Sequence, residues 1–339
     1  MSFSPLSASI QPASPDQLNA ECIKTLRSFK VGDGGYVAVV GAGPSSPIIP
    51  RGDDLIAEMK KACGIDCDNG IPFWDFYEAA KNGNPVEYSR ILKSKFDGAP
   101  YWSSDVYEMI CQISFKSIIT TNYDQYLPKA FGKVEGSGWN DRFCVYPPRR
   151  SPNANGAGMA TAIDFDYKKY LVAIHGYRDT AHEDWPLDSI ILTKSDYMLH
   201  YFAASKSQFL YGWWKQVLSS HNCIFIGTSL QEPGIGKALL DLGTSGAFTR
   251  QPRRHLQLIN ASLSETEISG IKQPPSYPKP EILHGAVQQV QFDPKTSFLG
   301  LLDVLSEIAG IPICTDFEPK MPAPAFPDFD NLNSFHDSP

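Results

Sequence analysis

Residues 36–45 read YVAVVGAGPS, and this stretch decides the fold. An uninterrupted apolar run is typical of a strand buried on both faces, as in the middle of a parallel sheet. Gly41 and Gly43 then permit a tight turn in which the backbone can approach a ligand closely. A buried strand followed by a glycine-rich turn therefore predicts the ligand-binding edge of an α/β sheet.

Four more runs of similar character lie farther along the chain. They are SIITT at 117–121, YLVAI at 170–174, CIFI at 223–226 and the more mixed HLQLI at 255–259. Segments with helical patterning, such as residues 53–63 and 208–218, lie between the runs. Strands that alternate with helices predict a doubly wound, Rossmann-like α/β fold with a mostly parallel sheet and helical insertions.

The rest of the chain indicates one large unit with insertions. Ser and Pro in residues 1–20 predict a flexible lead-in, and the Pro-rich residues 313–339 predict an extended tail. We expect the sheet-forming unit to span residues 21–312, with insertions at about 62–110 and 131–168. Within the second insertion, residues 132–158 are rich in Gly, Pro, Asn and Arg, which is typical of a long loop or a small insertion beside the sheet.

Composition and charge argue against several classes of protein. The chain has 339 residues, with 30 basic and 37 acidic side chains and a formal net charge of -7. An acidic chain without a Lys/Arg run lacks the features of a protein that binds nucleic acid directly. No apolar stretch is long enough to span a membrane, and the N-terminus does not resemble a signal peptide. Seven scattered cysteines agree with a reducing compartment, so we expect a cytoplasmic location.

Polar residues follow four of the buried runs. These loops read GAGPSS at 41–46, NYD at 122–124, HG at 175–176 and GTS at 227–229. Because the carboxyl ends of parallel strands meet at one edge of a sheet, the loops are expected to share one site. A glycine turn before a helix N-terminus suits a phosphate, so the sequence predicts a nucleotide site. Ser46 breaks the G-x-G-x-x-G fingerprint of dehydrogenases, and a tight turn without a ligand is the alternative for GAG taken alone.

The order of these loops resembles the sirtuin (SIR2) family, and most closely its bacterial SIR2-like branch, whose members hydrolyse NAD⁺ and often serve in anti-phage defence. The resemblance covers about residues 30–310, and its most specific piece is TTNYD at 120–124. It implies a sirtuin-type fold with NAD⁺ as the substrate. The NAD⁺-binding residues that it implies are Gly41, Ala42, Gly43 and Ser45 at the pyrophosphate, Gly227, Thr228 and Ser229 on the adenosine side, Asn260 at the adenine ribose, and Thr121 and Asp124 from the TTNYD motif.

The same resemblance implies catalytic roles for two residues. Asn122 would position a water or hold the nicotinamide ribose, and His175 would be the general base, while Asp124 would contact the carboxamide. The chemistry agrees with this choice, because nicotinamide leaves from a cationic ring without a general acid. An amide and an imidazole can orient the nucleophile and accept its proton near neutral pH. The alternatives are a helix N-cap for Asn122 and a core histidine for His175.

One feature of the sirtuin deacylases is missing. Their structural zinc is held by two cysteine pairs, which usually lie between the His-Gly strand and the Gly-Thr-Ser strand. Residues 171–227 contain only Cys223, so we expect neither a zinc module nor another metal. Related bacterial proteins often carry Asp at the position of Glu232.

These observations lead to the hypothesis of an NAD⁺ glycohydrolase that yields ADP-ribose and nicotinamide. The resemblance implies a toxic effector of bacterial anti-phage defence that acts by abortive infection. It also implies control by a homo-oligomer or by a separate regulatory protein, such as an ATPase, an Argonaute-type protein or a phage-derived trigger. The alternatives are an NAD-dependent protein deacylase and a non-catalytic module that senses NAD⁺ or ADP-ribose.

Overall fold

The structure is a computed structural model of the chain. It describes residues 35–45, 52–65, 71–97, 105–146, 168–178, 190–202, 209–228, 230, 232–244, 255–260 and 287–292. The predicted lead-in at 1–20 and the predicted tail at 313–339 lie outside these residues, so both stay predictions.

In the described part of the chain, seven strands form one sheet in the order β3-β4-β2-β1-β5-β6-β7. The strands are β1 (Val37–Val40), β2 (Ser117–Thr120), β3 (Phe143–Val145), β4 (Leu171–Ala173), β5 (Cys223–Ile226), β6 (His255–Asn260) and β7 (Val287–Phe292). Every neighbouring pair is parallel. Strands β2, β4 and β3 lie on one side of β1, and strands β5, β6 and β7 lie on the other side. The predicted doubly wound α/β fold is therefore confirmed, with its switch point between β1 and β5.

The sequence predicts five of these strands to within one residue at either end, and it misses β3 and β7. The prediction of a loop over 132–158 is wrong at Phe143–Val145, which pairs with β4 at the edge of the sheet. This strand is short and half-buried, so it lacks the apolar run that marks an interior strand. Strand β7, VQQVQF, is the other edge strand, and glutamines interrupt its apolar residues.

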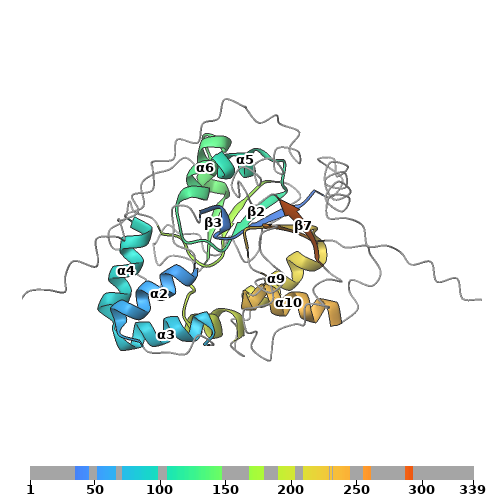
Figure 1. Ribbon diagram of the computed structural model, residues 1–339. Coiled ribbons are helices and arrows are strands. Elements are labelled where there is room, and N and C mark those ends of the chain that lie inside the picture. The colour runs from blue at the N-terminus through green and yellow to red at the C-terminus, as the bar shows by residue number, and fades with distance from the viewer. Residues whose placement is uncertain are drawn as a thin grey trace, which may run out of the picture.

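Helices cover both faces of the sheet. In Figure 1, α5 and α6 lie on one face and α9 and α10 on the other, while α2, α3 and α4 form a group to one side. The α-helices are α2 (Gly52–Cys63), α3 (Phe73–Gly83), α4 (Pro85–Asp97), α5 (Asp105–Gln112), α6 (Tyr126–Glu135), α8 (Lys194–Tyr197), α9 (Phe209–Ser220) and α10 (Pro233–Thr244). The short turns are the 3₁₀ helices η1 (Gly43–Ser45) and η2 (Trp139–Arg142) and the π-helical turn η4 (Met198–Phe202). The helices predicted at 53–63 and 208–218 are α2 and α9.

Alternation along β1 explains why this strand reads as one apolar run. Ala38 and Val40 pack in the core cluster that includes residues of α5 and α6. Val37 and Val39 pack in a second cluster with residues of α9 and α10. Because successive side chains of a strand point to opposite faces, a strand covered on both sides must be apolar at every position.

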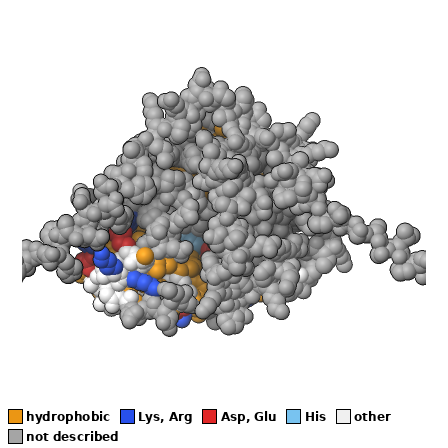
Figure 2. Space-filling view, viewed as in Figure 1, with side chains coloured by type: hydrophobic (Ala, Val, Ile, Leu, Met, Phe, Trp, Pro, Cys, Tyr) orange, Lys and Arg blue, Asp and Glu red, His pale blue; other side chains and the backbone are white. Residues whose placement is uncertain are grey.

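The helical group α2–α4 has a core of its own, which includes Ile190 and Leu192. Helix α3 is also joined to α8 by polar contacts. Lys194 Nζ lies 2.5 Å from Asp75 Oδ1, and Ser195 Oγ donates a hydrogen bond of 2.6 Å to Glu78 Oε2. These contacts fix the start of the segment that continues into η4. Figure 2 shows apolar side chains beside Lys and Arg side chains over this helical group.

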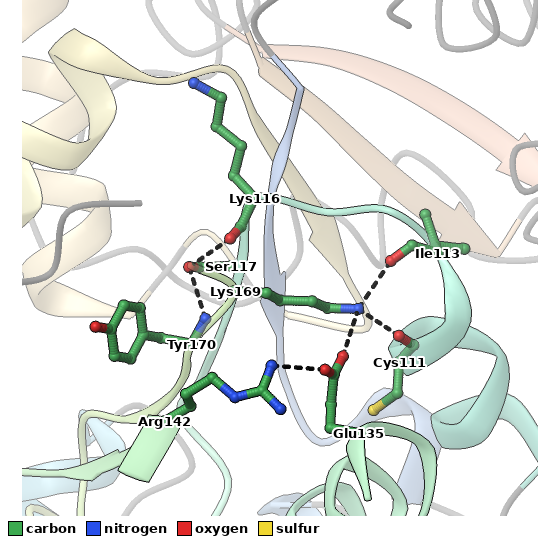
Figure 3. Close-up of polar contacts among 8 residues, drawn as sticks. All are labelled: Cys111, Ile113, Lys116, Ser117, Glu135, Arg142, Lys169 and Tyr170. Atoms are coloured by element: carbon green, nitrogen blue, oxygen red, sulfur yellow. Dashed lines mark hydrogen bonds and ion pairs between the residues drawn. The ribbon is translucent and has the colours of Figure 1, made fainter. Parts of the chain in front are cut away.

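A half-buried lysine, Lys169, stabilises the edge of the sheet at which the strands begin, just before β4. Lys169 Nζ donates hydrogen bonds to the carbonyls of Cys111 and Ile113, the latter at 3.0 Å, and lies 3.5 Å from Glu135 Oε1 (Figure 3). Arg142 holds the other oxygen of Glu135 at 2.7 Å. Burial lowers the pKa of Lys169. These contacts join the end of α5 to the end of α6 at the edge where the strands begin. The carboxyl ends of the strands lie at the other edge of the sheet. Within the described chain, no helix has the length and apolar character needed to cross a membrane.

Candidate active site

The loops after β1 and β5 are packed against each other at the switch point. Gly41 N donates to Ile226 O at 3.0 Å, and Gly43 N donates to Gly227 O at 2.9 Å. A Cβ atom on Gly43 would lie 2.5 Å from the Cα of Gly227, which itself has a φ of 59°. Glycine is therefore required at these positions because two backbones meet there.

This packing uses backbone N–H groups of residues that the sirtuin resemblance assigned to the pyrophosphate. The N–H groups of Gly41 and Gly43 are already bonded to carbonyls of the β5 loop, and Pro44 has no N–H. Ala42 and Gly43 are exposed at the tip of the turn. A role for this loop at the pyrophosphate stays a prediction, and its donors would have to be other than those two N–H groups.

Asn122 joins the loop after β2 to the loop after β1. Its Nδ2 lies 2.9 Å from Gly41 O, 3.2 Å from Tyr107 Oη and 3.4 Å from Ser45 Oγ. The side chain is only 6% exposed. The alternative of a helix N-cap is wrong for Asn122, because the N–H of Tyr126, the first residue of α6, donates to Asp124 Oδ1 at 3.0 Å. The amide of Asn122 thus has its N–H side turned into the protein.

Asp124 lies in the same cluster and is buried. Its Oδ2 accepts a hydrogen bond of 2.9 Å from Ser45 Oγ, which also bonds to Tyr107 Oη. Burial raises the pKa of Asp124 to about 6, although the hydrogen bonds from Tyr126 N and Ser45 oppose the rise. We call Ser45, Tyr107, Asn122 and Asp124 the Asn122 cluster. Most of its hydrogen-bonding capacity is satisfied within the protein.

His175, after β4, lies among aromatic rings. Its ring stacks on Tyr123 with a centroid separation of 6.4 Å and meets the edges of Tyr197 and Tyr201 at 5.6 and 5.9 Å. Its Nε2 lies 2.7 Å from Tyr201 Oη and 3.4 Å from Glu232 Oε1. At 2% exposure it is as buried as a core histidine. Unlike a histidine in an apolar core, it has a hydroxyl and a carboxylate beside it.

Tyr123 links the two predicted catalytic loops. It lies in the chain between Asn122 and Asp124, and its ring stacks on His175. Its carbonyl accepts a hydrogen bond of 2.7 Å from Arg178 N, and its hydroxyl donates to Ile191 O at 2.8 Å. Since β2 and β4 are adjacent strands, the loops with Asn122 and His175 meet at one edge of the sheet.

The structure describes contacts for some of the remaining predicted residues but not for all of them. Thr121 N donates to Val40 O at 3.2 Å, and the carbonyl of the buried Thr228 accepts a hydrogen bond of 3.2 Å from Gln257 Nε2. Asn260 ends β6, but its side chain lies outside the described atoms, as does the whole of Ser229. Their contacts with NAD⁺ stay predictions.

Sequence reasoning missed Tyr107, Tyr201 and Glu232 as members of the site. Tyr107 and Tyr201 lie on helical turns, where an aromatic residue in an apolar pattern indicates burial but not a polar partner. Glu232 had a usable signal, because Pro233 follows it and proline is common at the first position of a helix. Glu232 Oε2 accepts a hydrogen bond of 2.7 Å from Ile235 N and so caps α10.

The described residues contain neither a metal-binding group nor a disulfide. No group of three or more His, Cys, Asp or Glu side chains is arranged there to hold a metal ion. The described cysteines, which are Cys63, Cys111, Cys144 and Cys223, form no disulfide with one another.

Comparison with known protein families gives a match for the central part of the chain. Residues 116–273 match the family model of the SIR2-like domain, a range that includes the loops with Asn122, His175 and Gly227. No curated protein matches the chain. SIR2-like domains use NAD⁺. Residues 116–273 are therefore similar to a SIR2-like domain, and the doubly wound parallel sheet with its polar carboxyl edge agrees with this similarity.

Proposed function

We propose that the protein is an NAD⁺ glycohydrolase, which converts NAD⁺ and water to ADP-ribose and nicotinamide. The observation that carries the proposal is the position of Asn122 and His175 just after the carboxyl ends of two adjacent parallel strands, β2 and β4. The SIR2-like match supports a function related to NAD⁺. An amide and an imidazole are the groups that this reaction requires, because the leaving nicotinamide needs no general acid.

The orientation of Asn122 suggests which of its atoms works on the substrate. Because Nδ2 is directed at oxygens of the Asn122 cluster, Oδ1 is the atom that can accept a hydrogen bond from a water or from a ribose hydroxyl. As the bond between C1′ and the nicotinamide nitrogen breaks, its electron pair goes to the ring nitrogen. The water oxygen bonds to C1′, and His175 takes the proton that the water loses.

The proposed cellular role is that of a toxic effector in anti-phage defence. Unrestrained cleavage of NAD⁺ would kill the host cell, so such an activity requires control. We propose that a homo-oligomer or a separate regulatory protein supplies this control. The support for this role is the resemblance of the loop order to the defence branch of the SIR2-like proteins.

The test is turnover of NAD⁺ by the purified full chain, without any peptide, followed by chromatography of the products. We expect nicotinamide and ADP-ribose in equal amounts. Asn122→Ala and His175→Ala should each lower the rate by about 100-fold or more, since general-base catalysis contributes about 10² to 10⁴. Arg90→Ala is the matched control, because Arg90 is 59% exposed and forms a surface ion pair with Glu87 on α4.

The other outcomes identify the alternatives. Nicotinamide release that requires an acetylated peptide would indicate a deacylase. Binding of NAD⁺ without turnover, both in the purified chain and in cells that express it, would indicate a sensing module. Measurement of cellular NAD⁺ belongs in the design, because a partner present only in the cell would restore an activity that the isolated chain lacks.

A further inference from the structure

The surroundings of His175 lead to an inference that rests on the proposed function. Both polar contacts that the described residues make with this ring fall on one nitrogen, Nε2. Tyr201 Oη is 2.7 Å from it and Glu232 Oε1 is 3.4 Å from it. The two partners come from η4 and from the start of α10, far from His175 in the chain.

Glu232 has two distinct oxygens. Oε2 caps α10 by accepting the hydrogen bond from Ile235 N, which accounts for one side of the carboxylate. Oε1 is buried and has no hydrogen-bond donor among the described residues, although the whole side chain is only 9% exposed. A helix cap alone does not explain a buried carboxylate oxygen directed at a histidine, because burial of an unpaired carboxylate oxygen is costly.

Tyr201 is held firmly in place beside the two groups. Its side chain is fully buried, and a Cβ atom on Gly234 would overlap its ring, so α10 leaves room for the ring only because residue 234 is glycine. Burial and the nearby Glu232 charge raise the pKa of Tyr201 well above its usual range. The hydroxyl is therefore neutral and can both accept from Nε2–H and donate a hydrogen bond.

Electrostatics decide which nitrogen of His175 carries the proton. A carboxylate oxygen can only accept, so a lone pair on Nε2 would face the lone pairs of Glu232 Oε1 inside the protein. A proton on Nε2 replaces this repulsion with attraction, and Tyr201 Oη accepts the hydrogen bond. The lone pair then lies on Nδ1. This is the logic of catalytic triads, in which a third group orients the base.

We propose that Glu232 and Tyr201 are positioning residues for the NAD⁺ cleavage reaction. They keep a proton on Nε2 of His175, so that Nδ1 is the nitrogen that accepts the proton of the attacking water. When Nδ1 takes that proton the ring becomes an imidazolium, and the Glu232 carboxylate stabilises its positive charge. Glu232 and Tyr201 touch neither the water nor NAD⁺ in this scheme.

Two variants are designed to remove the positioning roles of Glu232 and Tyr201 while the protein still folds. Glu232→Gln keeps an oxygen for Ile235 N but loses the charge, and Tyr201→Phe removes only the hydroxyl. We expect each to lower kcat by about 10-fold or more, a share of the general-base contribution, with KM for NAD⁺ and the unfolding midpoint little changed. Glu87→Gln is the matched control, because it makes the same carboxylate-to-amide change at a surface ion pair with Arg90 on α4, away from His175 and from the segment that carries Tyr201.

A second readout is independent of activity. In the full chain with ¹⁵N-labelled histidine, the NMR shifts of the two ring nitrogens report which one bears the proton. His175→Ala identifies the signals of His175. We expect the Nε2–H tautomer in the natural protein and an increase in Nδ1–H in Glu232→Gln and Tyr201→Phe, with no change in Glu87→Gln.

The outcomes separate the two proposals. If the natural protein does not cleave NAD⁺, the proposed function fails, and the tautomer of His175 alone decides the positioning roles. The positioning proposal is overturned if His175 carries its proton on Nδ1 in the natural protein. It is also overturned if the protein is active and Glu232→Gln loses no more activity than Glu87→Gln.

Discussion

At the scale of single residues, the polar side chains at the carboxyl edge bind one another before they bind any substrate. Ser45, Asn122 and Asp124 come from the loops after two strands, and they meet around the hydroxyl of Tyr107. Their burial makes the geometry rigid but also removes Asp124 from water. A site built in this way presents a few oriented atoms rather than a row of solvated groups.

Asp124 gives a prediction about stability and pH. Its pKa is raised to about 6 by burial, so between about pH 4 and 6 the folded protein binds a proton that the unfolded chain has lost. The contribution of this group is therefore greatest at low pH and is lost as the pH rises through about 6, at a cost of up to about 3 kcal/mol at pH 7. Asp124→Asn keeps an acceptor for Tyr126 N and removes this cost. Urea unfolding should show the variant to be more stable at pH 7.5, by up to about 3 kcal/mol, with the difference shrinking toward pH 4.5.

The comparison at several pH values supplies the control, since the natural protein and the variant differ only in one ionisable group. An Asp124→Asn protein that is less stable than the natural protein at every pH would contradict the argument. It would mean that the hydrogen bond from Ser45 requires a charged acceptor.

At the scale of elements, the loops after β1 and β5 together form the switch point of the sheet. The β1 loop bonds to the β5 loop through Gly41 and Gly43, and the absence of Cβ atoms on both sides lets the backbones touch. The β2 loop then reaches Gly41 through Asn122. Three loops from the central strands are thus locked together, which fixes where a nucleotide can lie.

Gly43→Ala tests this locking. Its Cβ would lie 2.5 Å from a backbone carbon, so the loops must separate, and we expect a loss of about 3 kcal/mol in the free energy of unfolding, as for other overpacked sites. Gly212→Ala in α9 is the control, because nothing lies within 4 Å of the added atom. Alanine is the better helix former, so this variant should gain about 0.5 to 1 kcal/mol. Equal effects of the two substitutions in urea unfolding would show that the loop contact is unimportant.

At the scale of the whole molecule, the proposed site draws on both halves of the sheet and on the helical group α2–α4. The segment 190–202 packs on that group and delivers Tyr201 to His175, so no half of the chain contains the site alone. The net charge of -7 opposes an anionic substrate. Binding of NAD⁺ must therefore depend on local donors rather than on long-range attraction.

Because the proposed site draws on several parts of the fold, we expect NAD⁺ to stabilise the folded protein against unfolding. For His175→Ala, which we expect to leave NAD⁺ intact, a concentration of 100 times the Kd should add about 2.7 kcal/mol and raise the unfolding temperature. Nicotinamide alone should have a much smaller effect at the same concentration, because it contacts only one part of the site. Thermal unfolding that is unaffected by millimolar NAD⁺ would count against an NAD⁺ site in this chain.

The sequence by itself determined the interior strands and the polar loops that follow them. These features are local, since a strand buried on both faces must be apolar at each position and a tight turn must contain glycine. Sequence reasoning missed β3 and β7, because edge strands have fewer buried positions and so lack a continuous apolar run. Only the tertiary structure placed Tyr107 beside Ser45 and Tyr201 beside His175, which are 62 and 26 residues apart in the chain. It alone showed that Glu232 faces His175, because a partner across the fold leaves no trace in local hydrophobic periodicity.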